Sequence, residues 1–280
     1  MSSVNKKISI VMAYYNRKPQ IISTLHSIQK SEYENIEVVI VDDCSDDAHN
    51  LKDSIDSFNF EIKYIEILKK DRTWTNPCVP YNMGFDECEG DIVIIQNPEC
   101  VHCGDIITYA SEKVTQANYV AFSCYSLAPD KSRQLLSKNI CQNSPDLDSM
   151  VKSLSQEICP IVATGGGRNH LSMWYNHPEY RNLCYHFTTA ISKDNLKDIN
   201  GFDERFKNGF GYDDDELLIR IRRKGLIVES IHPDEGIFSI HLWHGDETKN
   251  PMNKRKRAKL YQINKNMLDR VRKESTWRAQ

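Results

Sequence analysis

At residues 36–47 the chain reads IEVVIVDDCSDD, a run of β-branched and apolar residues that passes directly into a cluster of acids. The apolar part predicts a buried strand, because such runs are typical of strands covered on both faces. Ser45 is a natural N-cap, so the stretch also predicts a helix that continues to about Phe58. A buried strand that leads through a polar turn into a helix is the repeating unit of α/β folds.

The same unit recurs along the chain. This alternation predicts an α/β fold with a mainly parallel, doubly wound central sheet, in which the strand at residues 91–96 is central because it is apolar on both faces. Polar residues follow the strands, at the carboxyl edge where open α/β sheets bind ligands. A small additional β-sheet and a C-terminal helix complete the expected fold. We expect the other strands at residues 8–13, 62–68, 119–124, 186–191, 226–231 and 237–240, and the helices at residues 19–28, 80–87, 104–116, 147–155, 194–198, 213–224 and 253–273.

The composition is that of an ordinary soluble globular protein. The 280 residues suffice for one large domain or two small ones, and 40% are apolar and 27% charged. The net charge of -3 gives no reason to expect a nucleic-acid partner. No segment approaches the roughly 20 apolar residues of a membrane helix, and the N-terminus lacks a signal-peptide pattern, so we expect a cytoplasmic location. The nine scattered cysteines favour reduced thiols over a disulfide framework.

Residues 208–216 read NGFGYDDDE, and the following LLIRIRRKG, which ends at Gly225, predicts a helix with four consecutive acids in its first turn. Capping and the helix dipole explain one or two acids at such a position. Four acids together repel one another, and a loop with two glycines and two aromatics leads to them. We therefore favour an exposed functional cleft over capping alone.

Two further motifs each allow two interpretations. Residues 164–168, TGGGR, lack the Lys-Ser/Thr pair of a phosphate loop. A mobile lid that uses Trp174, Tyr175 and His177 to contact a ligand is one interpretation, and an ordinary surface loop is the other. Residues 100–103, CVHC, suggest a zinc or redox site, but no second Cys or His pair follows at finger spacing, so buried, unbridged thiols are favoured.

Several motifs, taken in order, resemble a known enzyme family. AYYNR (residues 13–17), VDDCSD (41–46), NMG (82–84) and NPE (97–99) resemble the family 2 nucleotide-sugar glycosyltransferases, which have the GT-A fold. The segment from GFDE (201–204) through the acidic turn to HLWH (241–244) resembles the acceptor side of β-1,4-galactosyltransferases and polypeptide GalNAc-transferases. Together these motifs cover about residues 8–250.

The resemblance implies a nucleotide pocket at the ends of the first two strands. Asp43 can accept a hydrogen bond from a uracil ring nitrogen, Ala13 and Tyr15 would line the pocket, and Asp42 would support it. Arg72 is expected to reach the nucleotide or its phosphates. The alternatives are helix capping for Asp42 and Asp43 and an exposed loop position for Arg72. We expect a UDP-sugar as the donor.

The resemblance also implies a site for Mn2+ or Mg2+. The family normally carries Asp-x-Asp at the end of the fourth strand, with its last carboxylate on the metal. Here Asn97-Pro98-Glu99 keeps the last carboxylate and offers a neutral oxygen at the first position, which predicts weaker metal binding. His244 and His241 are the further expected ligands, because a mixed oxygen and nitrogen set suits Mn2+. Hydrogen-bonded structural histidines are the alternative.

The implied reaction is transfer of a sugar from the nucleotide to an acceptor hydroxyl, with inversion at the anomeric carbon as in family 2. Asp214 is expected to be the general base, with Asp213 and Asp215 orienting the acceptor or raising the basicity of Asp214. Glu99 and Asp214 must then face one cleft, although they lie far apart in the sequence. The side chains expected to stack on acceptor sugars are those of Trp174, Tyr175, His177, Phe210 and Tyr212.

Two other classes stay open. The missing first acid of the metal triplet would suit a catalytically inactive nucleotide-sugar or glycan-binding module. A nucleotidyltransferase is disfavoured, because such enzymes usually place a glycine-rich loop after the first strand and residues 13–17 contain no glycine.

The expected domain organisation follows from the motifs. A glycosyltransferase domain at residues 1–250 would contain a nucleotide-sugar-binding half at 1–125 and an acceptor-binding half at 126–250. A basic helical extension at residues 251–280 follows. Its KRKR run at residues 254–257 could contact an anionic surface, but a solvated helix face is favoured.

Overall fold

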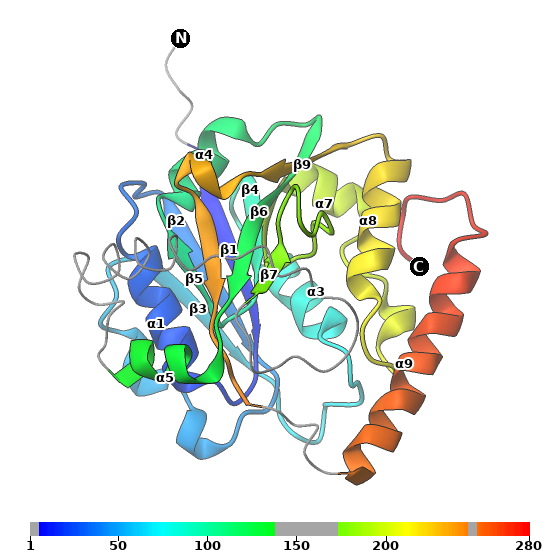
Figure 1. The fold of residues 1–280 in the computed structure, drawn as a ribbon, viewed down its shortest axis with the longest axis horizontal. Coiled ribbons are helices and arrows are strands. Elements are labelled where there is room, and N and C mark those ends of the chain that lie inside the picture. Colours follow the sequence, from blue (N-terminus) through cyan, green and yellow to red (C-terminus); the bar gives the residue numbers. More distant parts are fainter. Residues whose placement is uncertain (1–5, 138–172, 246–250) are drawn as a thin grey trace.

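The computed structural model describes residues 6–137, 173–245 and 251–280, which form an α/β structure around one curled sheet (Figure 1). Within these residues the sheet has ten strands, with the path β3-β2-β1-β4-β8-β6-β10-β5 and with β7 and β9 paired to β6. The predicted helix at 147–155 and loop at 164–168 lie outside the described residues. The strands are β1 (Ile8–Tyr14), β2 (Ile36–Asp42), β3 (Glu61–Glu66), β4 (Ile92–Gln96), β5 (Cys100–Cys103), β6 (Asn118–Ser126), β7 (Met173–Asn176), β8 (Thr188–Ser192), β9 (Ile227–Ile231) and β10 (Phe238–His241).

Helices cover both faces of the sheet, as the continuous apolar strands require. Alternate side chains of β1 enter two different cores. Ile10 packs in the core beneath α1 and α4, and Val11 packs in the core beneath α3, α7 and α8. The helices are α1 (Lys18–Ile28), α2 (Lys52–Ile55), α3 (Cys78–Glu87), α4 (Ile106–Lys113), α5 (Pro129–Ser137), α7 (Lys193–Ile199), α8 (Asp213–Arg223) and α9 (Pro251–Val271), with short 3-10 turns η1 (Asp47–His49), η3 (Glu204–Phe206) and η4 (Pro233–Glu235).

The sheet confirms the predicted fold class, with one correction to the position of β4. Strands β3, β2, β1 and β4 are parallel, with Ile10 of β1 opposite Val38 of β2 and Ile94 of β4. On its other side β4 pairs with β8, which runs antiparallel to both β4 and β6. The strand at residues 91–96 is therefore parallel on one side only. A strand buried on both faces is apolar whether its neighbour is parallel or antiparallel. The apolar run at residues 91–96 therefore could not show the direction of β8.

The helix predicted from Ser45 to Phe58 is wrong. The segment contains only the short turn η1 and the four-residue α2. Ser45 does not cap either element, because its hydroxyl accepts a hydrogen bond from the backbone N–H of Asn16 at 2.9 Å. Asp46 is also engaged with this loop: its backbone N–H donates to Asn16 Oδ1 at 2.8 Å. The polar residues after β2 thus join two loops at the carboxyl edge of the sheet.

The CVHC motif forms the buried strand β5. Cys100 and Cys103 are buried. All seven cysteines of the described ranges are free of disulfide bonds. His102 Nε2 lies 2.7 Å from Gln96 Oε1, and burial lowers the pKa of this histidine to about 4. These contacts confirm the structural interpretation of the motif.

Helix α8 is fixed to the body of the protein by a buried arginine. Arg220, only 1% exposed, donates to Glu216 one turn earlier in the helix. The same guanidinium donates to the carbonyl oxygens of Ile199 and Gly201, at the end of α7. Every charge and donor at this point has a partner, as a buried ion pair requires. The acidic first turn of α8 is therefore held in a defined place.

Helix α9 packs beside α8 and supports the loop that precedes it (Figure 1). The backbone N–H of Phe210 donates to the carbonyl oxygen of Leu260 at 3.1 Å. Asn264 is fully buried, and its Nδ2 donates to the carbonyl oxygen of Gly211 at 2.8 Å. A Cβ atom on Gly209 would lie 2.0 Å from Asn264 Oδ1, so only glycine fits at that position. The division of the chain at residue 250 stays a prediction.

No helix in the described part of the chain combines the length and the apolar composition that crossing a bilayer requires. Lys254, Arg255 and Lys256 at the start of α9 are exposed, in line with the solvated face that was favoured for this run.

The first prediction concerns acid stability. Glu37 is buried, and burial alone would raise its pKa, but Ser9, the Glu89 backbone and the ammonium groups of Lys7 and Lys63 lower this pKa to about 2. A carboxyl with a depressed folded-state pKa stabilises the fold above its ordinary pKa of 4.5 and loses that contribution as the pH falls towards 2. As the pH falls over this range, the unfolding free energy of the unaltered protein should decrease by about 3 kcal/mol more than that of the Glu37→Gln variant.

Urea unfolding at a series of pH values measures this difference. Glu61→Gln is the matched control, because Glu61 also pairs with Lys7 but is 52% exposed. Parallel stability curves for Glu37→Gln and the unaltered protein would show that Glu37 does not carry the effect.

The second prediction concerns the support of the acidic loop by α9. Asn264→Ala leaves the partly buried carbonyl oxygen of Gly211 without its donor, so we expect a loss of about 1–3 kcal/mol in unfolding free energy. Asn266→Ala on the exposed face of the same helix is the control and should change stability by less than about 0.5 kcal/mol. Equal effects of the two substitutions in denaturant titrations would contradict the role of Asn264.

Candidate functional site

The residues predicted to bind a nucleotide lie together at the ends of β1 and β2. Asp43 is 6% exposed and accepts a hydrogen bond from Trp74 Nε1 at 2.9 Å. Its second oxygen lies 2.9 Å from a guanidinium nitrogen of Arg72, and the Arg72 guanidinium lies 5.0 Å from the ring centre of Tyr15. Burial raises the pKa of Asp43 although Arg72 opposes it. Ala13, near the end of β1, is opposite Val41 in the register.

Asp42 supports this group from below. Its Oδ1 accepts the backbone N–H of Ser45 at 2.8 Å, and its Oδ2 accepts from the hydroxyl of Tyr64. Both oxygens are thus used inside the protein, which fits the supporting role that was expected for Asp42. Asn16, with a positive φ of 50°, turns the neighbouring loop so that Tyr15 lies at the surface, 38% exposed.

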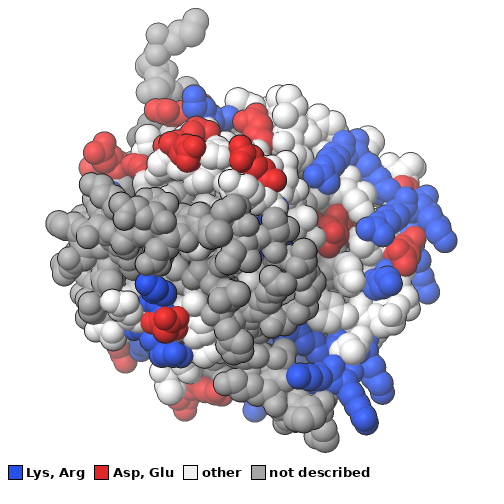
Figure 2. All heavy atoms as spheres, viewed as in Figure 1, with Lys and Arg blue, Asp and Glu red and all other residues white. Residues whose placement is uncertain are grey.

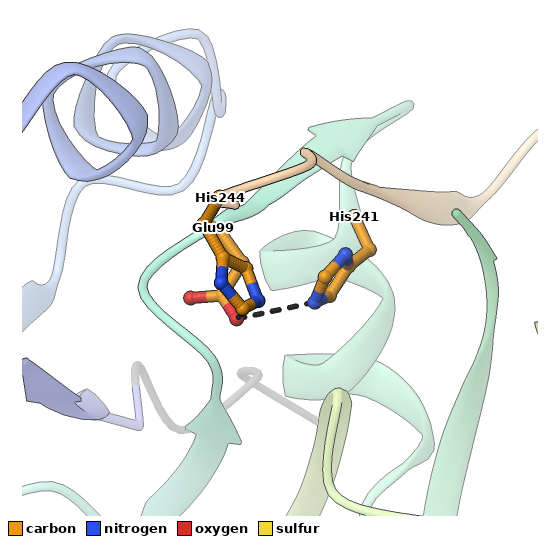
Figure 3. Close-up of side chains that lie close together, drawn as sticks. All are labelled: Glu99, His241 and His244. Atoms are coloured by element: carbon orange, nitrogen blue, oxygen red, sulfur yellow. Dashed lines mark ion pairs between the residues drawn. The ribbon is translucent and has the colours of Figure 1, made fainter. Parts of the chain in front are cut away.

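Glu99 and two histidines form the second cluster (Figure 3). Glu99 is 1% exposed, and its Oε1 lies 3.1 Å from His241 Nε2 and 3.4 Å from His244 Nε2. Strand β10 brings His241 to this point because it pairs antiparallel to β5, with His241 opposite Cys100. The three predicted metal ligands are therefore close together, and ligand atoms of all three lie within 4.8 Å of one another.

A positively charged arginine lies next to Glu99 in this cluster. One guanidinium nitrogen of Arg17 lies 2.8 Å from both oxygens of Glu99. Burial alone would raise the pKa of Glu99, but Arg17, His244 and His241 hold it well below its usual range. Burial lowers the pKa of His244 to about 3, so this imidazole is neutral at pH 7 and has a lone pair to donate.

This donor set fits a divalent cation. It offers a carboxylate and two imidazoles, and His241 Nδ1 is buried without a hydrogen-bond partner within the described residues. Arg17 is 27% exposed and therefore close to solvent, so it can move away from Glu99 when a cation binds. The side-chain oxygen of Asn97 is already engaged, because Asn97 Oδ1 accepts a hydrogen bond from the Tyr81 hydroxyl at 3.1 Å.

The acidic turn forms the third cluster, and each of its aspartates has a different partner. Asp213 is 6% exposed and accepts from Asn76 Nδ2 at 2.9 Å, and Asp215 accepts from the Tyr185 hydroxyl at 3.0 Å. Asp214 Oδ1 lies 2.5 Å from His186 Nδ1 and accepts the backbone N–H of the same residue at 2.8 Å.

The three aspartates differ in their surroundings. Burial raises the pKa of Asp213 and of Asp215. Burial alone would lower the pKa of His186, but the nearby carboxylates of Asp214 and Asp213 raise it. The Asp214 side chain keeps 24% of its surface exposed, and both of its contacts with His186 fall on Oδ1. Oδ2 is thus the oxygen that a ligand could reach.

The second and third clusters are joined through two short connections. The Tyr81 hydroxyl shares its proton between Asn97 Oδ1 and the carbonyl oxygen of Gln96, three residues before Glu99. The Tyr81 and His186 rings pack edge to face, with their centres 5.1 Å apart. Phe187, next to His186, packs edge-on against His241 at 6.0 Å. The side chains that flank Glu99 and Asp214 are therefore in contact, as one common site requires.

The predicted acceptor aromatics fall into two groups. Trp174 and His177 are 1% and 2% exposed, and Trp174 packs in a core with Tyr125 and Phe238. Both side chains are buried in the described residues, and a role in acceptor binding stays a prediction for them. The pattern could not detect this, since exposed and buried aromatics look alike in sequence.

The remaining aromatics are partly exposed. Tyr175 packs 4.9 Å from His241, so it lies next to the Glu99 cluster. Phe210 and Tyr212, in the loop before α8, both pack edge-on against Tyr261 of α9. For these three residues a role in acceptor binding stays a prediction.

Sequence reasoning missed several residues of the site. Arg17 lies in the AYYNR motif, and its pairing with Glu99 was not predicted. His186 was expected only as the first residue of a strand, and Tyr81 and Trp74 were not singled out. Contacts between distant segments define these roles, and no local pattern carries them. The one available signal was the position of Arg17, directly after a strand at the ligand-binding edge.

Comparison with known proteins gives the family. The model of glycosyl transferase family 2 matches residues 9–164, and a model described as the N-terminal domain of galactosyltransferase matches residues 169–243. Among curated proteins, the amylovoran biosynthesis glycosyltransferase AmsB of Erwinia amylovora is 34% identical over 85 residues. That match covers 30% of this chain and 28% of the relative.

Solved structures share the fold at low sequence identity. The mannosyltransferase PcManGT from Pyrobaculum calidifontis, in complex with GDP-Man and Mn2+, is 13% identical with a TM-score of 0.53 over 86% of this chain and 58% of that one. S. aureus TarS 1-349 in complex with UDP-GlcNAc is 14% identical with a TM-score of 0.54, over 86% and 60%. GalNAc-T7 with UDP, GalNAc and Mn2+ is 13% identical with a TM-score of 0.52, over 88% and 45%.

These likenesses confirm the predicted GT-A fold, and the chain spans less than two thirds of each of these structures. The two family models match in the order that the motifs predicted, with the nucleotide-side motifs in the first and the acidic turn in the second. Because the first model spans more than half of the chain, this protein belongs to glycosyl transferase family 2.

Proposed function

We propose that this protein transfers a sugar from a UDP-sugar to the hydroxyl group of an acceptor, with Asp214 as the general base. The contact between the Glu99 and Asp214 clusters through Tyr81 and Phe187 is the observation that carries this proposal. It allows a leaving diphosphate and an attacking hydroxyl to be bound within one site, which is what displacement at an anomeric carbon requires.

The nucleotide is assigned to the cluster around Asp43. Its carboxylate can accept a hydrogen bond from the ring N–H of uracil once Trp74 or Arg72 gives way, and the exposed Tyr15 ring offers a stacking surface. Arg72 then provides a charge-assisted donor for the ribose or the phosphates. UDP in the structures of TarS and GalNAc-T7, two proteins of similar fold, supports uracil over guanine, whereas GDP-Man in PcManGT keeps guanine as the alternative.

Glu99, His241 and His244 would hold a divalent cation, with Mn2+ favoured by the mixed donor set. When bound, such a cation supplies positive charge to the diphosphate of the donor. Arg17, displaced from Glu99, is close enough to contribute a second positive charge to the same phosphates. Asn97 would then lie on the nucleotide side of this cluster, where Tyr81 orients its amide.

Asp214 is assigned as the base because it combines a fixed position with an exposed oxygen. His186 holds Oδ1, which leaves Oδ2 to accept the proton of the acceptor hydroxyl as that oxygen attacks the sugar. Asp213 and Asp215 are oriented by Asn76 and Tyr185 and are assigned to acceptor hydroxyls. Direct displacement in this way would invert the anomeric configuration, in agreement with the resemblance to family 2.

Substitution of the base tests the proposal. We expect Asp214→Asn to lower the rate of sugar transfer, or of donor hydrolysis in the absence of an acceptor, by about 10²- to 10⁴-fold, because the amide cannot accept the proton. UDP affinity, measured by calorimetry, should stay within about twofold, since Asp214 lies in a separate cluster. Asp234→Asn is the matched control, because Asp234 is 89% exposed. Unchanged activity in Asp214→Asn would remove the base assignment.

Substitution of the metal ligands gives a separate test. We expect Glu99→Gln and His244→Ala each to weaken Mn2+ binding in the presence of UDP by at least about tenfold, as measured from the electron paramagnetic resonance of free Mn2+. Glu89→Gln is the control, since Glu89 is 62% exposed and remote from the site.

The same titrations address the alternatives. UDP binding that does not respond to Mn2+ in the unaltered protein would favour a metal-independent or purely binding role, in which Arg17 keeps its contact with Glu99. Tight binding of GDP with no response to UDP would overturn the donor assignment without affecting the fold.

A further inference from the structure

A cavity of about 330 Å³ lies beside the acidic turn, between α8, α9 and the segment that precedes β8. Asp215 and Tyr185 line one end of it, and Arg222, Arg223 and Arg272 line the other parts together with Leu218. None of these residues belongs to the Glu99 cluster or to the Asp43 cluster. The cavity therefore adjoins the proposed acceptor side of the site and is separate from the groups assigned to the donor.

The helix period explains why the cavity extends along α8. Residues 215, 218, 219 and 222 recur at intervals of three and four, so they share one face of the helix. Asp215 lies in the first turn and Arg222 in the last, and seven residues at 1.5 Å per residue separate their backbones by roughly 10 Å. A molecule in the cavity can thus reach an acid at one end and a cation at the other.

The arginines give the far end of this cavity a positive charge. Arg223 is fixed, because its guanidinium donates to the carbonyl oxygens of Val271 and Arg272 at the end of α9. Arg222 is exposed, and Arg272 is 57% exposed with only a loose contact of 3.4 Å to Asp269. The charge of Arg272 also reaches Asp215, where it opposes the effect of burial on that carboxyl. Figure 2 shows Lys and Arg gathered on the side of the molecule where α8 and α9 lie.

We propose that this cavity binds an anionic group of the acceptor, a phosphate ester or a carboxylate, through Arg222 and Arg272. Arg223 adds charge but is held by the backbone of α9, whereas Arg222 is exposed and, within the described residues, the Arg272 guanidinium makes only the 3.4 Å contact with Asp269, so both can turn towards a ligand. Planar guanidinium groups match phosphate and carboxylate oxygens with paired hydrogen bonds. The assignment of this anion to the acceptor rests on the proposed function, because the cavity adjoins Asp215 of the acidic turn.

Anion binding can be tested without knowledge of the acceptor. The probes are inorganic phosphate, glycerol phosphate and acetate, titrated at low ionic strength and followed by calorimetry, with 31P line broadening for the two phosphates. We expect saturable binding that falls at least about tenfold in the double variant Arg222→Ala/Arg272→Ala, because each charge-assisted hydrogen bond contributes strongly to affinity. The double variant Arg222→Lys/Arg272→Lys should retain part of the binding.

The control is Arg255→Ala/Arg270→Ala, which removes the same charge from exposed positions of α9 outside the cavity lining. It should bind phosphate within about twofold of the unaltered protein. An equal loss in this control, or the absence of saturable binding, would overturn the proposal, because the general charge of α9 would then explain any attraction. Stronger binding of phosphate than of acetate identifies a phosphate ester as the preferred group, and the reverse identifies a carboxylate.

A second readout separates this proposal from the proposed function. UDP affinity in the presence of Mn2+ should not change in Arg222→Ala/Arg272→Ala, and a tenfold loss there would instead assign the arginines to the donor diphosphate and overturn the proposal. Unchanged activity in Asp214→Asn would remove the base assignment but would leave the phosphate titration valid. Loss of phosphate binding with donor hydrolysis intact is the result that supports an anion site specific to the acceptor.

Discussion

The buried guanidinium of Arg220 fixes the acidic first turn of α8 to the end of α7. An unpaired charge at 1% exposure would be strongly destabilising, so Arg220 must keep Glu216 and the carbonyl oxygens of Ile199 and Gly201. Glu216 belongs to the same turn as the three aspartates. The ion pair therefore fixes the start of α8 relative to α7 and to the sheet on which α7 packs. Without it, the four acids could relieve their repulsion by turning outwards into solvent.

The two acidic clusters are stabilised in different ways, and this difference suits their proposed roles. Glu99 is paired with the full positive charge of Arg17, and its Oε1 lies 3.1 Å from His241 Nε2 and 3.4 Å from His244 Nε2. Such a carboxylate stays ionised and is suited to a cation. Asp213 and Asp215 are instead held by the neutral donors of Asn76 and Tyr185, and burial raises the pKa of both.

The sequence predicted the parallel half of the sheet and the residue types of the site better than their contacts. Strands β1, β2 and β4 were predictable because burial on both faces leaves continuous apolar runs. The antiparallel insertion of β8 was not, since hydrogen bonding direction leaves no mark on such a run. The helix after Ser45 failed for a related reason: the hydroxyl that would cap it binds Asn16, a residue from another loop. His186 and Arg17 acquire their roles through the same kind of distant contact.

The C-terminal helix α9 is joined to α8 and to the loop that precedes α8 by several independent contacts. Asn264 and Leu260 hold the backbone of residues 209–211, Tyr261 packs against Phe210 and Tyr212, and Arg223 of α8 binds the carbonyl end of α9. Gly209 and Gly211 must lack a side chain because α9 is so close that an added Cβ would lie 2.0 Å from Asn264 Oδ1 or 2.9 Å from the Tyr261 ring. The two glycines before the acidic turn are thus required by the packing of this loop against α9. A loop that served only as a flexible lid would not need a buried asparagine from a helix more than fifty residues away to hold its carbonyl oxygen.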